Sequence, residues 1–225
     1  MRFLGITIFL FSSWKASCQR PKSGAWLSLQ LPVSISQKWQ WHNDAGYRTL
    51  GNRTAASQFL YRTGLRYKIS EQWNTAGGIA FFFTRSSFEK TNHEFGKEFR
   101  IWQEVNYKCI IANHIQWQNR IRTEQRFYAA TNNRAAFTAY RFRLKSQLQQ
   151  SISKKWSLQL ANEYMQQLTH SKLAFDQNRL IIAGVFQPDN STQLQAGYMW
   201  LRWPAHSSQH IFTVTVQKNI SFHGK

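Results

Sequence analysis

Charged side chains occupy every second position of one stretch, which reads Arg120-Ile121-Arg122-Thr123-Glu124-Gln125-Arg126. A β-strand has a side-chain period of two, so all four charges would fall on one face, whereas a helix would spread them around its circumference. Guanidinium forks on such a face can pair bidentately with carboxylates or attract anions. The stretch therefore predicts a strand with one charged face and one less polar face.

The same alternation recurs elsewhere in the chain. Residues 61–69, 99–108, 140–148 and 156–164 each place apolar or aromatic side chains on one face and polar or charged ones on the other. Because the pattern recurs in strand after strand, we expect the charges to point into a barrel and the other face to meet lipid. The inward candidates are Arg62, Arg66, Arg100, Glu104, Arg120, Arg122, Glu124, Arg126, Arg141, Arg143, Lys145 and Glu163.

Three roles are open for these inward charges. In the first, Glu104, Glu124 and Glu163 are each held by several arginines, and the network fills and stiffens a narrow barrel. In the second, the excess of basic residues makes the lumen a cationic path or pocket for small anions. The third is an enzymatic site, which the sequence supports least, because it contains no phosphate-binding loop, no Gly-x-Ser-x-Gly elbow and no His-Glu-x-x-His motif.

Residues suited to other chemistry are sparse. His206 and His210 have a suggestive spacing but no neighbouring Cys or acid, so we expect no metal site and no cofactor. His170 and Ser171 are adjacent and would be the candidates in a lipid-modifying enzyme. Nucleic-acid binding is disfavoured, because the positive charge is spread along the whole chain instead of gathering in one groove.

The N-terminal residues predict export. The chain has 225 residues, with 29 Lys+Arg against 10 Asp+Glu. Residues 1–18 have the form of a secretory signal: Arg2, an apolar run, and small residues before a predicted cleavage at Gln19. Beyond them, no apolar stretch approaches the roughly 18 residues that a spanning helix needs. We therefore expect residues 19–225 to form a single β-barrel domain.

Two features of this segment leave alternatives open. Cys18 permits lipidation, although Lys15 stands where a bacterial lipobox prefers Leu. The segment could also be an N-terminal core strand. After cleavage only Cys109 would remain, which excludes an intrachain disulfide.

Short turns and longer loops alternate along the chain. The short turns lie near 34–37, 70–72, 111–114, 151–155 and 188–191, and the longer loops near 50–57, 85–98, 129–134, 169–176 and 203–209. This predicts an antiparallel up-and-down transmembrane barrel with short periplasmic turns and longer outer loops. We count about eleven strands. An antiparallel barrel closes with an even number, so either the short first segment lies outside the wall, giving ten, or one strand is unrecognised, giving twelve.

An aromatic residue follows most of the short turns. Trp39, Trp73, Trp117 and Trp156 recur at spacings of 34, 44 and 39 residues, a hairpin period. Four tryptophans at the same strand end would form a girdle at one membrane interface. The alternative is that they plug the bottom of a soluble barrel.

A series of short motifs resembles a known family, bacterial outer-membrane-barrel-like proteins catalogued as domain of unknown function 2490. The matching pieces cover nearly the whole mature chain in order: Trp26, Tyr47-Arg48, Arg62-Thr63-Gly64-Leu65-Arg66-Tyr67, Arg100-Ile101-Trp102-Gln103-Glu104, the Arg120–Arg126 run, Arg141-Phe142-Arg143, Asn162-Glu163, Phe175-Asp176-Gln177-Asn178-Arg179 and Gly197-Tyr198. The resemblance implies a barrel in the outer membrane and supplies no activity, substrate or catalytic residue.

The sequence thus predicts an outer-membrane barrel without covalent chemistry, with a structural role or a role in passive transport or binding of small anions. Its expected partners are outer-membrane lipids, lipopolysaccharide and the barrel assembly machinery, which could recognise Phe222 near the C-terminus, and no nucleic acid. The second interpretation is a soluble or surface barrel that binds a ligand inside, as lipocalins do. The third is an outer-membrane lipid-modifying enzyme.

Overall fold

The computed structural model describes residues 22–51, 56–85, 95–131, 134–205 and 207–221, and the predicted signal segment lies outside these ranges. The regular elements of these residues are all strands. No helix among them is long and apolar enough to cross a membrane. The strands are β1 (Lys22–Gln30), β2 (Val33–Ser34), β3 (Trp39–Thr49), β4 (Ala56–Lys68), β5 (Trp73–Arg85), β6 (Phe95–Ala112), β7 (Ile115–Tyr128), β8 (Phe137–Ser151), β9 (Trp156–Thr169), β10 (Lys172–Phe186), β11 (Thr192–Arg202), β12 (Ser208–Lys218) and β13 (Ile220–Ser221).

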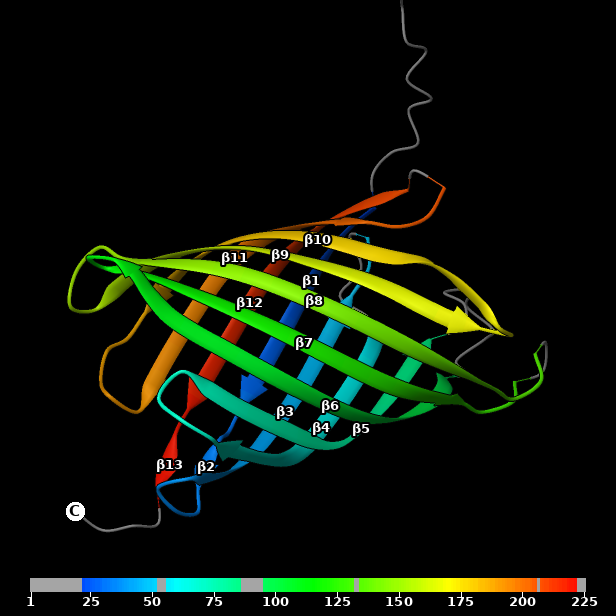
Figure 1. Ribbon diagram of the computed structural model, residues 1–225. Coiled ribbons are helices and arrows are strands. Elements are labelled where there is room, and N and C mark those ends of the chain that lie inside the picture. Colours follow the sequence, from blue (N-terminus) through cyan, green and yellow to red (C-terminus); the bar gives the residue numbers. More distant parts are fainter. Residues whose placement is uncertain (1–21, 52–55, 86–94, 132–133, 206, 222–225) are drawn as a thin grey trace, which may run out of the picture.

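The strands form one closed wall (Figure 1). From β3 to β12, each strand pairs antiparallel with the next in the chain. β1 closes the barrel between β12, to which it runs parallel, and β3, to which it runs antiparallel. The barrel predicted from the alternation is therefore confirmed.

The wall is eleven strands around, although it contains thirteen strand elements. β2 continues β1 after Leu31 and Pro32, and β13 continues β12 after Asn219, with the two short pieces paired to each other. The count of about eleven strands is therefore confirmed. The short first segment joins the wall, so the parity argument for ten or twelve strands does not apply. An odd number brings the first and last strands together in parallel, which satisfies their backbone groups as an antiparallel closure would.

One predicted loop is wrong. The chain does not loop across residues 169–176, because β9 and β10 are joined by a two-residue turn at His170 and Ser171. Both residues have positive φ, 49° and 60°, the conformation of the tight turn that matches strand twist. Neither residue is the Gly or Asn that usually marks such a turn, so the turn could not be recognised from residue types.

The two faces of the wall differ as the alternation predicts. Large apolar and aromatic side chains on the outward face are exposed, among them Tyr61, Leu65, Tyr140, Phe142 and Leu144. The inward face holds the charged residues and two apolar clusters, one of Leu60, Ala76, Ala80, Phe82 and Trp102 and the other of Met199, Leu201 and Ile211.

The Trp102 indole lies against Gly64, which faces Gly78 on the adjacent strand. A Cβ at Gly64 or Gly78 would overlap backbone atoms of the neighbouring strand, so this close approach requires glycine. The buried indole donates its Nε1 proton to the Ile79 carbonyl at 3.2 Å.

Candidate functional site: a charged lumen

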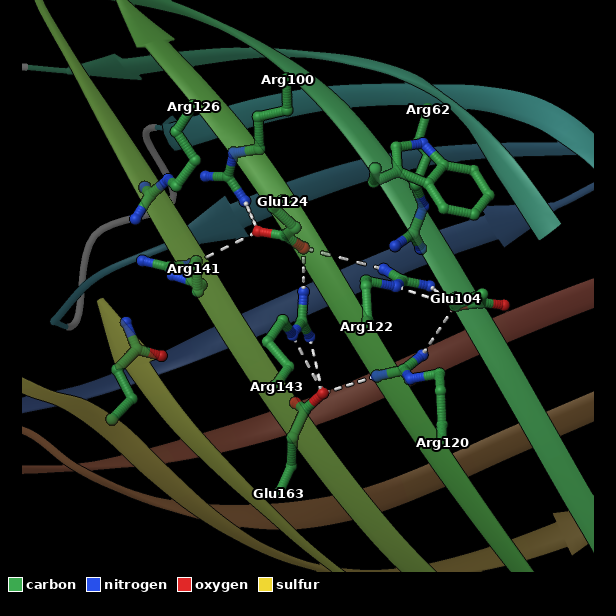
Figure 2. A network of polar contacts seen from close by, with 12 residues as sticks. Arg62, Arg100, Glu104, Arg120, Arg122, Glu124, Arg126, Arg141, Arg143 and Glu163 are labelled. Atoms are coloured by element: carbon green, nitrogen blue, oxygen red, sulfur yellow. Dashed lines mark hydrogen bonds and ion pairs between the residues drawn. The ribbon is translucent and has the colours of Figure 1, made fainter. Parts of the chain in front are cut away.

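Strand register places opposite charges next to each other inside the barrel. Arg122 on β7 lies between Glu104 on β6 and Arg143 on β8, and Lys145 on β8 faces Glu163 on β9. Because these positions are directly opposite across neighbouring strands, their side chains meet on the same face. All twelve charges predicted to point inward lie on this face, and eight of them are ion-paired in Figure 2.

Glu124 is the most connected carboxylate. It accepts hydrogen bonds from Arg143 at 2.6 Å and Arg100 at 3.1 Å, and it is 3.9 Å from Arg141 and 4.0 Å from Arg122. Its side chain is 3% exposed, so water does not screen these pairs. Four arginines thus surround the Glu124 carboxylate.

Glu104 and Glu163 are two further centres of the network. Glu104 pairs with Arg122 and lies 3.5 Å from Arg66 and 3.9 Å from Arg120. Glu163 accepts from Arg143 at 2.8 Å and Arg179 at 3.3 Å, and from Arg120. Arg143 thus joins Glu124 to Glu163, and Arg120 joins Glu163 to Glu104, giving one continuous network (Figure 2).

Four charged members were missed from the sequence. Asp44 pairs with Arg62, Glu98 bonds Arg100 and Arg126, and Asp176 lies 2.9 Å from Arg141. Arg179, the fourth, pairs with Glu163. Glu98 and Asp176 were assigned to predicted loops, but they lie in β6 and β10. Extending the period-two pattern to these positions would have found them.

Cations outnumber carboxylates in the lumen two to one. Among the residues that the structure describes, twelve basic residues take part in the network or line the cavity beside it, against six carboxylates. Within the described part of the chain, Arg48 and Lys145 pair with no carboxylate; they bond the amide oxygens of Gln58 and Gln147 at 2.6 and 2.7 Å. The Arg48 guanidinium also stacks on the Trp26 ring, 3.8 Å from its centroid. The network therefore leaves positive charge available to water, counter-ions or a ligand.

A cavity of about 850 Å³ runs beside the network. It is lined at one end by residues such as Thr84 and Tyr128, near the longer loops, and at the other by Gln149 and Gln193, near the short turns. Gln209 and Gln217 on β12 both line it and are eight residues apart, which corresponds to roughly 20 Å along a tilted barrel axis. The mean cross-section is then roughly 40 Å², several times that of a water molecule.

A collar of glutamines surrounds the short-turn part of this cavity. It comes from β1, β7, β8, β9, β11 and β12 and consists of Gln30, Gln118, Gln147, Gln149, Gln159, Gln193, Gln195 and Gln217. Each amide can both donate and accept hydrogen bonds without adding charge. The collar went unnoticed in the sequence, because polar uncharged residues at alternating positions carry little signal.

The four predicted girdle tryptophans lie on the outward face. Trp39, Trp73, Trp117 and Trp156 are between 38% and 52% exposed, and each stands within three residues of the start of a strand at the short-turn end. Three of them pack against an aromatic ring of the adjacent strand: Tyr67, Tyr107 and Phe186. The tryptophans therefore do not plug the interior.

The other chemical candidates do not converge. Ser171 and His170 form the β9–β10 turn, and His210 faces outward against Tyr198. His206 lies outside the described residues. Among the residues described, no three His, Cys, Asp or Glu side chains group so as to hold a metal ion.

Residues 23–210 match a protein family described as "Protein of unknown function (DUF2490)". The chain belongs to this family. No curated protein matches the DUF2490 chain in sequence. Among solved structures, the DUF2490 barrel is similar to a NanC porin in a rhombohedral crystal form, with a TM-score of 0.55 and 10% sequence identity, over 88% of this chain and 97% of that chain. At this identity the likeness concerns the fold alone, a closed all-β barrel.

Proposed function

We propose that the protein is a bacterial outer-membrane barrel whose lumen binds small anions or lets them pass. Two observations support this: the described residues of the lumen carry six more cations than carboxylates, and the cavity extends from the longer-loop end to the short-turn end. Low-dielectric walls lined by one sign of charge concentrate counter-ions inside. The proposal assigns neither covalent chemistry nor a cofactor to the barrel.

The outward face supports placement in a membrane. Aromatic pairs form a second belt near the longer loops, where Phe59 packs on Tyr47 and Phe99 on Phe127. On β4, Phe59 and Tyr67 belong to opposite belts and are eight residues apart. That separation corresponds to roughly 20 Å along the barrel axis, near the ~25 Å apolar band of outer-membrane barrels.

The cavity favours a conducting lumen over a network that only fills and stiffens the barrel. A network that only replaced an apolar core would balance its charges, because unpaired buried charge is costly. Here Arg48 and Lys145 bond neutral amides, and both line the cavity. A pore also needs sites weak enough to release the ion, and the glutamine collar supplies uncharged hydrogen-bonding groups towards the short-turn end.

Membrane insertion is tested with the mature chain. We expect it to require detergent or lipid, and to migrate faster on a gel when unheated than when boiled. A mature chain that is monodisperse in buffer without detergent, with no gel shift, would overturn the membrane assignment and leave the soluble ligand-binding barrel. If the chain does require detergent or lipid, its expected partners are outer-membrane lipids, lipopolysaccharide and the assembly machinery.

Anion passage is tested by reversal potential in planar bilayers under a KCl gradient. We expect the wild type to prefer chloride and the double variant Arg48→Gln/Lys145→Gln to lose part of that preference. Lys155→Gln, in an exposed turn, is the matched control that removes a lysine outside the lumen and should leave selectivity unchanged. A folded barrel that is sealed, or that prefers potassium, would refute the anion path.

A further inference from the structure

A second basic pocket lies at the short-turn end of the barrel. Its volume is about 280 Å³, and it shares no lining residue with the lumen cavity. Four cations line it: Lys38, Arg66, Lys68 and Lys108. Of the described carboxylates, Glu71 alone lines it; this side chain is 85% exposed and pairs with Lys68. Arg66 also lies 3.5 Å from Glu104 of the lumen network. Lys38 and Lys108 pair with no carboxylate among the described residues, so the pocket still carries an excess of positive charge.

Backbone hydrogen bonds bring these lysines together from two strands and one turn. The Lys68 amide donates to the Lys38 carbonyl at 2.8 Å, which joins the end of β4 to the β2–β3 turn. The Lys108 amide donates to the Gln72 carbonyl at 2.9 Å, which joins β6 to the β4–β5 turn. The ammonium groups are thus carried on a rigid rim, and the pocket lies between two successive turns.

The two turns have the same hydrogen-bonding geometry. In the first, Ser36 Oγ accepts the backbone N–H groups of Lys38 at 3.3 Å and Trp39 at 3.0 Å. In the second, Ser70 Oγ accepts those of Gln72 at 3.2 Å and Trp73 at 3.1 Å. A hydroxyl oxygen occupied as an acceptor in this way keeps its own proton as a donor. Ser36 and Ser70 both line the pocket, as does Ser34.

The groups around the pocket are thus mainly donors. Ammonium, guanidinium and hydroxyl groups from both turns surround it, and they suit a ligand with several acceptor oxygens and negative charge. The Lys68 ammonium, by bonding Glu71, holds the pKa of that carboxyl below its usual range, and Lys108 adds to the effect. The acid therefore stays paired with a lysine and leaves the other cations available.

We infer that the pocket between the Ser36 and Ser70 turns is an oxyanion-binding site that takes a phosphate- or sulfate-type group. This inference is independent of whether the lumen conducts, because the two cavities share no residue. The space of about 280 Å³ holds such a group together with several waters, each of which takes ~30 Å³. The group is either a soluble anion at the barrel mouth or the headgroup phosphate of a membrane lipid.

The third turn of the same form supplies a matched control. Ser153 Oγ accepts the backbone N–H groups of Lys155 at 3.3 Å and Trp156 at 3.2 Å, so Lys155 is the positional equivalent of Lys38. Lys155 does not line the pocket. Lys38→Gln and Lys155→Gln thus remove the same charge from the same kind of turn, one at the site and one away from it.

The test is a titration of inorganic phosphate into the barrel in zwitterionic detergent, followed by backbone amide NMR. We expect the Ser36, Lys38 and Ser70 amides to shift, and affinity to fall at least about tenfold in Lys38→Gln/Lys108→Gln, the loss of two charge-assisted contacts. Lys155→Gln should bind as the wild type does. Gel mobility of unheated samples confirms that each variant is folded.

A second arm identifies the source of the anion. The titration is repeated in nanodiscs that contain anionic phosphatidylglycerol: phosphate binding that disappears there assigns the pocket to a lipid headgroup, and binding that persists assigns it to a soluble anion. Phosphate affinity that is equal in Lys38→Gln/Lys108→Gln and Lys155→Gln, or shifts confined to lumen amides, would overturn the inference. Shifts confined to the lumen would still leave the proposed anion path intact, so the two failures are distinguishable.

Discussion

Replacing Glu124 with Gln tests whether the lumen network holds the barrel together. The substitution keeps the shape of the side chain and one acceptor oxygen but removes the charge that four arginines approach within 4.0 Å. Because the Glu124 side chain is 3% exposed, water has little access to the position from which the charge is removed. Removing one partner of a buried pair costs about 3–5 kcal/mol, and we expect a loss in that range.

The measurement is urea unfolding in detergent micelles, followed by tryptophan fluorescence and gel mobility. The double variant Glu124→Gln/Arg143→Gln removes a guanidinium together with the carboxylate, so we expect it to lose less than the sum of the two single variants, by about 1 kcal/mol or more. Glu71→Gln is the control for an exposed pair with Lys68 and should leave the unfolding midpoint unchanged.

A second readout separates stability from selectivity. Glu124→Gln raises the excess positive charge of the lumen by one, so the preference for chloride should hold or increase while the barrel is less stable. A variant within about 1 kcal/mol of the wild type would show that the arginines are satisfied without Glu124, and would refute the network as a source of stability. A fall in chloride preference would contradict the cationic lumen.

Three further outcomes are expected from single positions. Gly78→Ala should fail to give the fast-migrating folded form, because a methyl would overlap the Thr63 carbonyl, whereas Gly184→Ala, with its nearest neighbour at 4.0 Å, should fold normally on the same gel. Hydrogen bonds from the hydroxyl and backbone of the following turn residues hold the pKa of Asp189 well below its usual range, so at pH 3 this carboxyl should still be ionised in the folded barrel. The lowered pKa stabilises the folded barrel above the unfolded pKa of ~3.9, and this stabilisation is lost as the pH falls through the folded pKa. A ¹³C NMR titration in which Asp189 titrates near ~3.9 would contradict this. Ser171→Gly should raise the free energy of unfolding in urea by about 0.5 kcal/mol, because glycine relieves the positive φ of 60°, and an unchanged or lower free energy would argue against strain there.

The faces of the strands could be predicted from the sequence because they depend on a single quantity, the side-chain period of two. All twelve inward charges and the four outward tryptophans follow from it. Their partners depend on register between strands, which the chain does not display. Glu124 was identified as an acceptor because it stands among arginines in its own strand, whereas Asp44 meets Arg62 only across β3 and β4.

Loop lengths and closure were harder to predict for a local reason. The turn at His170 and Ser171 lacks Gly and Asn, so its polar residues indicated a longer loop and hid the start of β10 together with Asp176. Closure depends on pairing between the two ends of the chain, and no local pattern fixes whether it is parallel. The parity rule for antiparallel barrels therefore pointed to ten or twelve strands where the structure has eleven.

The parallel pairing of β1 with β12 also bears on how the barrel forms. From β3 to β12, each pair of neighbouring strands is consecutive in the chain, so a turn or loop holds the two strands in register while they pair. The pairing of β1 with β12, which places Lys22 opposite Gln209, has no such connection. Most of the chain must therefore be folded before these two strands can pair. Closure is then the slow, late step of folding, and it must bring nine residue pairs into register, from Lys22–Gln209 to Gln30–Gln217.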